Sequence, residues 1–306
     1  MQKELKHIWK ALVQTAKDFG ALNIFRMSAA LAYYTIFGLA PVLIIVLRFV
    51  SVFASKKPVG YIFLQIRKVV GDAVALQIQS IIQNVIAMQR DVLMQVIGIV
   101  ALIISATGVF TEIQDSINTI WRVRAKPKHG WLKLLLNRLL SFSIVISLGF
   151  ILLVSLLVNA LLAALMSRLN QLFPESTVFT SYIVNIAITF LTTTTLFAII
   201  FKVLPDARIK WQDVFVGAIT TAILFMLGRF LIGYYLQKST ITNTFGAASS
   251  IIIILSWVYY SAIILYFGAA FTRANAQLKG REIEPNDYAV WIETVERKSK
   301  SVVNSN

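Results

Sequence analysis

Six long apolar stretches alternate with polar or basic connections along the chain, and this pattern determines the predicted architecture. A helix satisfies its own backbone hydrogen bonds in hydrocarbon, and it needs about 20 apolar residues to cross a bilayer. The stretches lack the alternation of polar and apolar residues that is typical of membrane-barrel strands. The predicted transmembrane helices are Met27–Ala54, Val92–Thr111, Leu139–Leu165, Val178–Phe201, Val214–Leu236 and Ala247–Thr272.

The predicted fold class is all-α: a polytopic integral membrane protein with six transmembrane helices. Residues 1–26 form a polar, basic N-terminal segment, residues 27–275 the transmembrane domain, and residues 276–306 a C-terminal tail. The first span follows a polar segment and lacks a convincing cleavage site, so we expect it to act as the insertion signal.

Between the first two spans, residues 61–90 repeat apolar positions at a helical period. The stripe that includes Val70, Val74 and Ile78 recurs every three or four residues, which predicts an amphipathic helix on the external side. One interpretation is a helix that lies on the membrane surface and buries its stripe there. The other is a gate over an external opening.

The distribution of Lys and Arg predicts the orientation. Alternate connections and tails hold 20 and 7 of these residues, and the richer set includes both termini. By the positive-inside rule, both termini and the connections around residues 122–133 and 202–210 are expected on the cytoplasmic side of the membrane. A net charge of +15 in a soluble protein would favour nucleic acid, but this distribution favours a membrane surface.

The amino-acid composition limits the kinds of chemistry that the chain can be expected to carry out. Hydrophobic residues make up 58% of the chain and charged residues 14%, which is far from a soluble enzyme. The chain has no cysteine and only His7 and His129, so neither thiol catalysis nor a histidine-rich metal site is expected. We predict no enzyme activity, no cofactor, no bound metal and no nucleic-acid partner. The expected partners are membrane lipids and an anionic lipid or small anion, with a homo-oligomer left open.

Two arginines fall inside predicted spans, where a charge is a functional candidate by default. Arg48 lies 21 residues into the first span and Arg229 lies 15 residues into the fifth, so both are expected in the outer half of the bilayer. Their planar guanidiniums suit bidentate binding of a phosphate or carboxylate, which makes them substrate-binding candidates. The alternative is that each side chain extends to the external head groups.

A second group of polar residues follows the second span. Glu112, Asp115 and Asn118 recur every three residues and are expected to share a helix face, where they would form an inner gate or couple an ion. The alternative is a wet face that pairs with basic loops. Pro41 in the first span predicts a helix kink, either structural or at the edge of a substrate cavity.

Several short motifs follow one another along the chain: Ala30–Pro41, Asp115–Trp121, Val203–Asp206, Gly217-Ala218, Tyr235, Phe245-Gly246, Trp257 and Leu265–Ala270. In this order they resemble the YihY/BrkB family of bacterial inner-membrane proteins, and the resemblance covers about residues 5 to 275. Two positions depart from the family pattern, which usually has Tyr where this chain has Phe245 and often Glu where it has Ala270.

The resemblance implies six spans with both ends in the cytoplasm, and it implies no settled activity. Members have been labelled ribonuclease BN, generally regarded as a mistake, and virulence or serum-resistance factors, and some have been proposed to move envelope lipids. The expected function is transport or flipping of an amphipathic or anionic envelope-related substrate. The alternatives are a non-catalytic scaffold for envelope biogenesis and, less favoured because the residues are missing, a membrane-bound hydrolase.

Overall fold

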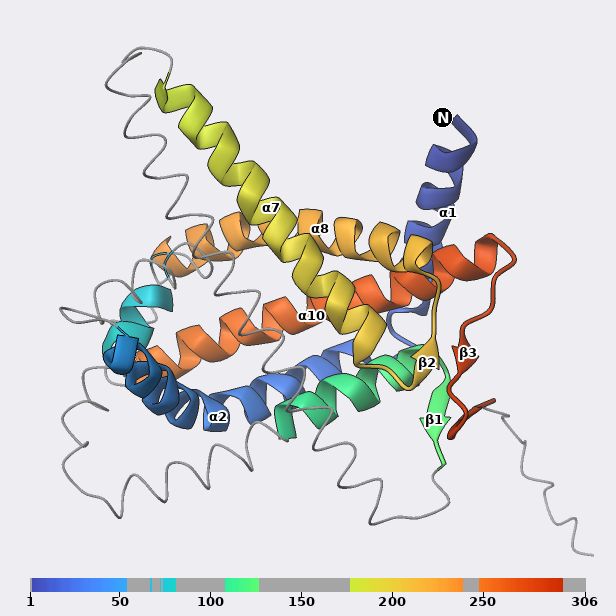
Figure 1. Cartoon of the computed structure of the whole chain (residues 1–306), viewed down its shortest axis with the longest axis horizontal. Helices are drawn as coiled ribbons and strands as arrows, with labels where there is room; N and C mark the ends of the chain where they lie inside the picture. Colours follow the sequence, from blue (N-terminus) through green and yellow to red (C-terminus); the bar gives the residue numbers. More distant parts are fainter. Residues whose placement is uncertain are drawn as a thin grey trace, which may run out of the picture.

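The computed structural model describes residues 2–53, 67, 72, 74–80, 108–126, 177–238 and 248–293, and helices dominate this part of the chain (Figure 1). Residues 74–80 and 108–120 are also helical. The elements with defined bounds are α1 (Gln2–Asp18), α2 (Ile24–Phe53), β1 (Val123–Ala125), α7 (Thr177–Val203), β2 (Ala207–Arg208), α8 (Trp211–Lys238), α10 (Ser249–Leu278), β3 (Glu284–Pro285) and β4 (Ala289–Trp291).

Three of the described helices are long and apolar enough to cross a membrane. They match the fourth, fifth and sixth predicted spans, and α2 covers the first as a 30-residue helix. The second predicted span is described only from residue 108 onward, and the third lies outside the described residues, so the total of six stays a prediction. The three candidate spans are Ile183–Val203, Trp211–Tyr235 and Ile251–Leu278.

The four short strands lie together at one end of the molecule, which we call the strand end (Figure 1). The end of α7, the start of α8 and the end of α10 reach the same place. The segments that follow or precede these helix ends belong to the set of connections and tails that is rich in Lys and Arg, which the charge pattern assigns to the cytoplasmic side. Residues 74–80 lie at the opposite end (Figure 1), with Val74 and Ile78 of the predicted stripe buried. The rest of the predicted external helix is largely outside the described residues.

Helices α8 and α10 run antiparallel and meet through small residues. A Cβ atom on Gly217 would lie 1.8 Å from Thr272 Oγ1, and one on Gly268 would lie 1.9 Å from Thr221 Oγ1. Each threonine therefore packs over the glycine of the other helix. Each threonine hydroxyl donates a 2.7 Å hydrogen bond to the glycine carbonyl four residues earlier in its own helix, so both hydroxyls are hydrogen-bonded. We call these four residues the glycine–threonine contact.

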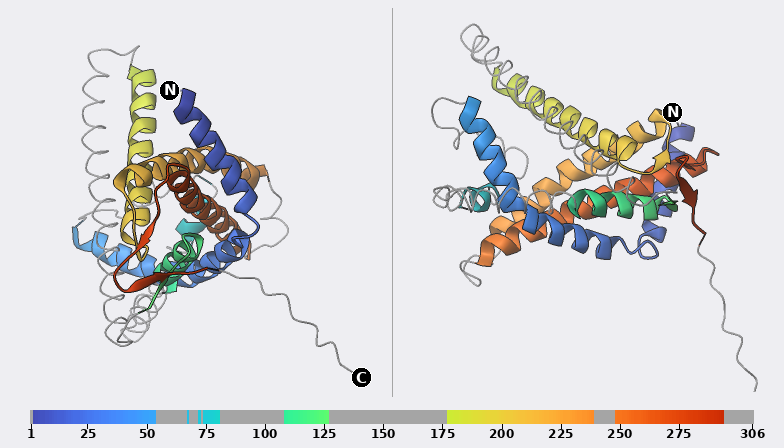
Figure 2. Two further views of the ribbon diagram at one scale, coloured as in Figure 1. Left: turned by 90° about the vertical axis from the view of Figure 1, so that its right-hand side faces the viewer. Right: turned by 60° about the horizontal axis from the view of Figure 1, so that its bottom comes forward.

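The same close approach continues along both helices. A Cβ atom on Gly228 would lie 1.2 Å from the Tyr260 hydroxyl, and Ala218 and Ala222 are fully buried. Small residues allow backbones to approach where lipid gives no hydrophobic driving force between helices. Helix α10 also packs against α1 and α2, and Figure 2 shows it passing between the surrounding helices.

The strands were not predicted, and they join segments that are distant in sequence. β1 pairs antiparallel with β4, with Val123 opposite Trp291, and β2 pairs antiparallel with β3, with Ala207 opposite Pro285. Each has only two or three residues, too few for a strand period to be visible in the sequence. Residues 281–293, part of the predicted tail, therefore fold back onto the strand end.

Adding a methyl group at Gly217 should separate α8 from α10. We expect Gly217→Ala to lower the free energy of unfolding by about 1–3 kcal/mol, as overpacking usually does. Thermal unfolding of the purified chain in detergent micelles would measure this. Gly233→Ala in the same helix is the matched control, because nothing lies within 4 Å of its added Cβ. The double variant Gly217→Ala, Thr272→Ala should recover part of the loss. Equal unfolding midpoints for the Gly217 and Gly233 variants would contradict the contact.

Candidate functional site

The two predicted intramembrane arginines lie in helices that start at the strand end. Arg229 follows the first residue of α8 by 18 positions, which is about 27 Å of helix rise. Its side chain is half-buried, while the neighbouring Phe230 and Leu231 are exposed at 74% and 64%. Arg48 and Pro41 lie in α2, and their side chains are outside the described residues. Helix α2 runs through Pro41 and changes direction along its length (Figure 2).

Glu112 and Asp115 line one surface cavity of about 180 Å³ between the helical residues 108–120 and the start of α2. Arg26 lines the same cavity, so one guanidinium and two carboxylates lie along its wall. Glu112 is half-buried and accepts a 3.2 Å hydrogen bond from the hydroxyl of the buried Ser116. A small charged ligand or a proton could be held at this place.

Burial raises the pKa of Glu112, which follows the predicted second span. The hydrogen bond that Ser116 donates to Glu112 favours the charged carboxylate and so opposes this rise in pKa. The negative charge of the neighbouring Asp115 adds to the rise. Desolvation is the largest cause, because a carboxylate in a partly apolar environment loses hydration. Glu112 therefore keeps its proton to a higher pH in the folded chain than an exposed glutamate would.

Asn118 faces away from this cavity. Three residues turn a helix by 300°, so each three-residue step drifts about 60° and Asn118 lies about 120° around the helix from Glu112. Its buried amide donates a 2.9 Å hydrogen bond to Asp206 Oδ2, and its carbonyl accepts one of 2.9 Å from the Asp206 backbone. Gln114 donates to Asp206 Oδ1 at 3.1 Å. The structure thus places Glu112 and Asp115 together and Asn118 in a separate polar junction, made of Gln114, Asn118 and Asp206.

Three of the motif segments meet beside this junction. Asn118 and Asp206 join two of them, and the Trp121 indole N–H donates a 2.9 Å hydrogen bond to the Ala269 carbonyl of the third. Asp206 follows Pro205, which ends α7 because proline cannot continue the helix. Sequence reasoning did not select Asp206 as a site residue, since its partner lies 88 positions away.

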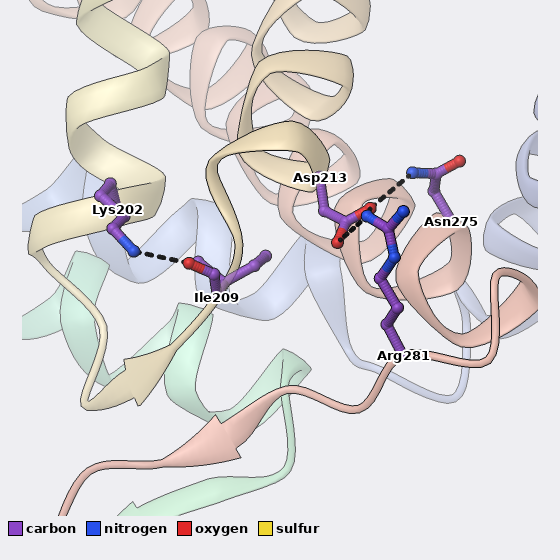
Figure 3. Close-up of polar contacts among 5 residues, drawn as sticks. All are labelled: Lys202, Ile209, Asp213, Asn275 and Arg281. Carbon is purple, nitrogen blue, oxygen red and sulfur yellow. Dashed lines mark hydrogen bonds and ion pairs between the residues drawn. The ribbon is translucent and has the colours of Figure 1, made fainter.

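A second buried carboxylate, Asp213, lies at the start of α8. Arg281 forms an ion pair with it at 3.1 Å, and Asn275 of α10 donates to it at 3.5 Å (Figure 3). Only 2% of the Asp213 side chain is exposed. Gly280, with φ of 66°, adopts the left-handed conformation that reverses the chain after α10, and the Arg281 N–H bonds the Ala276 carbonyl. That reversal brings Arg281 back to Asp213.

Lys202, near the end of α7, holds the connection that joins α7 to α8. Its ammonium donates to the Ile209 carbonyl at 2.5 Å and lies 5.5 Å from the Trp211 ring centroid (Figure 3). Within the described ranges, no group of three or more His, Asp or Glu side chains is arranged to hold a metal ion. The buried charges at the strand end therefore have protein partners, and their arrangement joins α7, α8 and α10.

A family model described as Virulence factor BrkB matches residues 15–289. A UPF0761 membrane protein of Alteromonas mediterranea is 26% identical over 276 residues, covering 88% of this chain and 87% of that protein. One of Stenotrophomonas maltophilia is 27% identical over 270 residues, covering 86% of this chain and 60% of that protein.

One of Paraburkholderia xenovorans is 29% identical over 188 residues, covering 58% of this chain and 39% of that protein. The chain thus spans less than two thirds of the length of several curated relatives that it matches. Their names describe membrane proteins and state no catalytic activity. No solved structure matches the chain.

Removing the Arg281 charge should leave the buried Asp213 carboxylate without its ion-pair partner. We expect Arg281→Gln to lower the free energy of unfolding by about 3 kcal/mol, because an uncompensated buried charge is costly. Arg208→Gln is the matched control, since it breaks an ion pair with Asp287 whose side chains are 58% and 86% exposed, and it should cost less than about 1 kcal/mol. Thermal unfolding compares the two. Similar losses, or no recovery when Asp213→Asn is added to Arg281→Gln, would contradict this role.

The raised pKa of Glu112 predicts a pH-dependent stability difference. Between its ordinary and its raised pKa, the unfolded chain releases the Glu112 proton while the folded chain keeps it, so this group lowers stability as pH rises. Glu112→Gln removes that penalty, and it should raise the unfolding midpoint at pH 7 more than at pH 4. Ser116→Ala, which removes the hydrogen bond to the charged form, should do the opposite. A Glu112→Gln effect that is the same at both pH values would refute the shift.

Proposed function

The chain belongs to the Virulence factor BrkB family, and from that premise we propose that it moves an amphipathic or anionic envelope-related substrate across the membrane. Arg48 and Arg229 bind the anionic group, and Glu112 with Asp115 forms an inner gate or couples an ion. The protein lies in the bacterial inner membrane, with six spans and both termini in the cytoplasm. The charge distribution supports this orientation, and so does the pairing at the strand end of the segment after residue 120, the connection between α7 and α8, and the C-terminal segment.

The position of Arg229 carries the proposal. The guanidinium belongs to a candidate span, Trp211–Tyr235, and its sequence neighbours expose apolar side chains. An arginine at the centre of a membrane helix costs about 2.5–3.5 kcal/mol on insertion scales, and Arg229, six residues before the end of this span, carries part of that cost. An oxyanion bound by the planar guanidinium would use this charge.

The small cavity at Glu112 supplies the second part of the proposal. Its two carboxylates follow the predicted second span and Arg26 precedes the first, positions that the proposed orientation puts at the cytoplasmic side. A carboxyl whose pKa is raised keeps its proton to a higher pH than an ordinary one, as catalytic and proton-coupling carboxyls often do. Asn118, bonded to Asp206, supports the helix that carries Glu112 and does not line this cavity.

Substitution of the arginines tests transport directly. Purified chain in liposomes should translocate fluorescent anionic lipids or small anions, and Arg48→Gln, Arg229→Gln should reduce the rate at least about tenfold. That size is expected because a hydrogen bond to a charged group contributes about 1.5–3 kcal/mol. Arg208→Gln is the control for loss of one positive charge at an exposed position.

The outcomes separate the functional classes. Activity that is lost in a double variant with an unchanged unfolding midpoint supports the proposed path between the first and fifth spans. Activity that is unchanged in the double variant removes the arginines from the mechanism. No translocation of either substrate class by the parent chain would favour the scaffold, and partners that co-purify with the intact chain would then be sought.

A further inference from the structure

A second and larger cavity lies at the strand end, where nothing in the proposed transport path places a ligand. It has a volume of about 330 Å³, which is within the range of small-molecule sites. The end of the helical residues 108–120, the last turns of α10 and the returning C-terminal segment form its walls. Six of its lining residues carry the chemistry: Trp121, Arg122, Arg273, Glu282, Trp291 and Glu293.

The charged residues of this cavity are balanced. Two guanidiniums and two carboxylates line it, so their formal charges cancel. Arg273 is fixed by a 2.8 Å hydrogen bond from its Nη1 atom to the Ile120 carbonyl. Within the part of the chain that the structure describes, the side chains of Arg122, Glu282 and Glu293 have no hydrogen bond or ion pair. Three charged groups thus remain available to a ligand.

The backbone at Arg122 supports a ligand-binding role. Its φ of 57° lies in the left-handed region, which is unfavourable for a residue with a side chain. The bond from the Ile292 N–H to the Arg122 carbonyl, at 2.9 Å, holds this conformation next to the β1–β4 pair. Strained residues of this kind concentrate at binding and catalytic sites. A glycine would be the unstrained choice if only the turn mattered.

Two tryptophans line the cavity, and the indole N–H of each is already hydrogen-bonded within the protein. The Trp121 N–H already donates to Ala269, and the Trp291 N–H donates to the Ile283 carbonyl at 3.1 Å. An indole face attracts an ammonium group, and nearby carboxylates add to that attraction. A guanidinium attracts a phosphate or carboxylate. A purely anionic ligand would be repelled by Glu282 and Glu293, and a purely cationic one by the two arginines.

We infer that this cavity binds a zwitterion that carries both an oxyanion and a primary ammonium, the chemistry of a phosphoethanolamine group. Arg122 and Arg273 bind the oxyanion, and Glu282, Glu293 and the indoles bind the ammonium. The group could come from a lipid head group or from a free metabolite. The inference does not rest on transport, because binding is measured at equilibrium.

Calorimetric titration of the full chain in neutral detergent tests it. The probes are phosphoethanolamine, inorganic phosphate, ethanolamine, and short-chain phosphatidylethanolamine and phosphatidylglycerol. We expect phosphoethanolamine to bind at least about tenfold more tightly than phosphate or ethanolamine. Tighter binding of the short-chain phosphatidylethanolamine would assign the site to a lipid, and binding of the free zwitterion alone would assign it to a metabolite.

Variants make the test specific. Arg122→Gln should weaken phosphoethanolamine binding about tenfold or more, whereas Arg124→Gln, an exposed change two residues further along that does not line the cavity, should leave it unchanged. Arg122→Gly should weaken binding and raise the unfolding midpoint, because glycine relieves the left-handed strain. Glu282→Gln should reduce the preference for the zwitterion over phosphate. Equal binding of phosphate and phosphoethanolamine, no binding of any probe, or equal effects at Arg122 and Arg124 would overturn the inference.

Discussion

The glycine–threonine contact between α8 and α10 is the interaction on which the described bundle depends. Lipid is as apolar as the helix surfaces, so these helices associate through close packing rather than through the hydrophobic effect. Thr221 and Thr272 each cover a glycine of the other helix and satisfy their own hydroxyls within their own helix. With α8 held in this way, α10 can contact α1 and α2 on its other sides and position the residues at its end.

The strand end shows how buried charge supports the same arrangement. Asp206 and Asp213 lie before and at the start of α8, and both are almost completely buried. Asn118 reaches Asp206 from the helix before β1, and Arg281 reaches Asp213 from the segment after α10. Breaking a buried pair costs more than the pair contributes, because the remaining charge has no compensation. These carboxylates therefore favour one relative placement of α7, α8 and α10 over alternatives with similar apolar packing.

The sequence predicted the long helices well, and it predicted contacts between distant residues poorly. Apolar runs of sufficient length predicted α7, α8 and α10. The partners of Asn118 and Asp213 are 88 and 68 positions away, and no local period records such distances. The three-residue spacing of Glu112, Asp115 and Asn118 suggested one face, but the accumulated rotation directs Asn118 to Asp206 instead. The sequence did not single out Arg122, since a left-handed φ at a non-glycine residue has no sequence signature.

The return of residues 281–293 to the strand end has a consequence for biosynthesis. Arg281 is synthesised 68 residues after Asp213, which at about 5–20 residues per second is a delay of roughly 3 to 14 s. During that time the Asp213 carboxylate has no cationic partner, and β1 and β2 have no strand to pair with. The start of α8 must then stay hydrated at the membrane surface until the later segment emerges. Completion of the chain thereby becomes the event that closes this end of the bundle, because only then does the Asp213 carboxylate gain the Arg281 guanidinium.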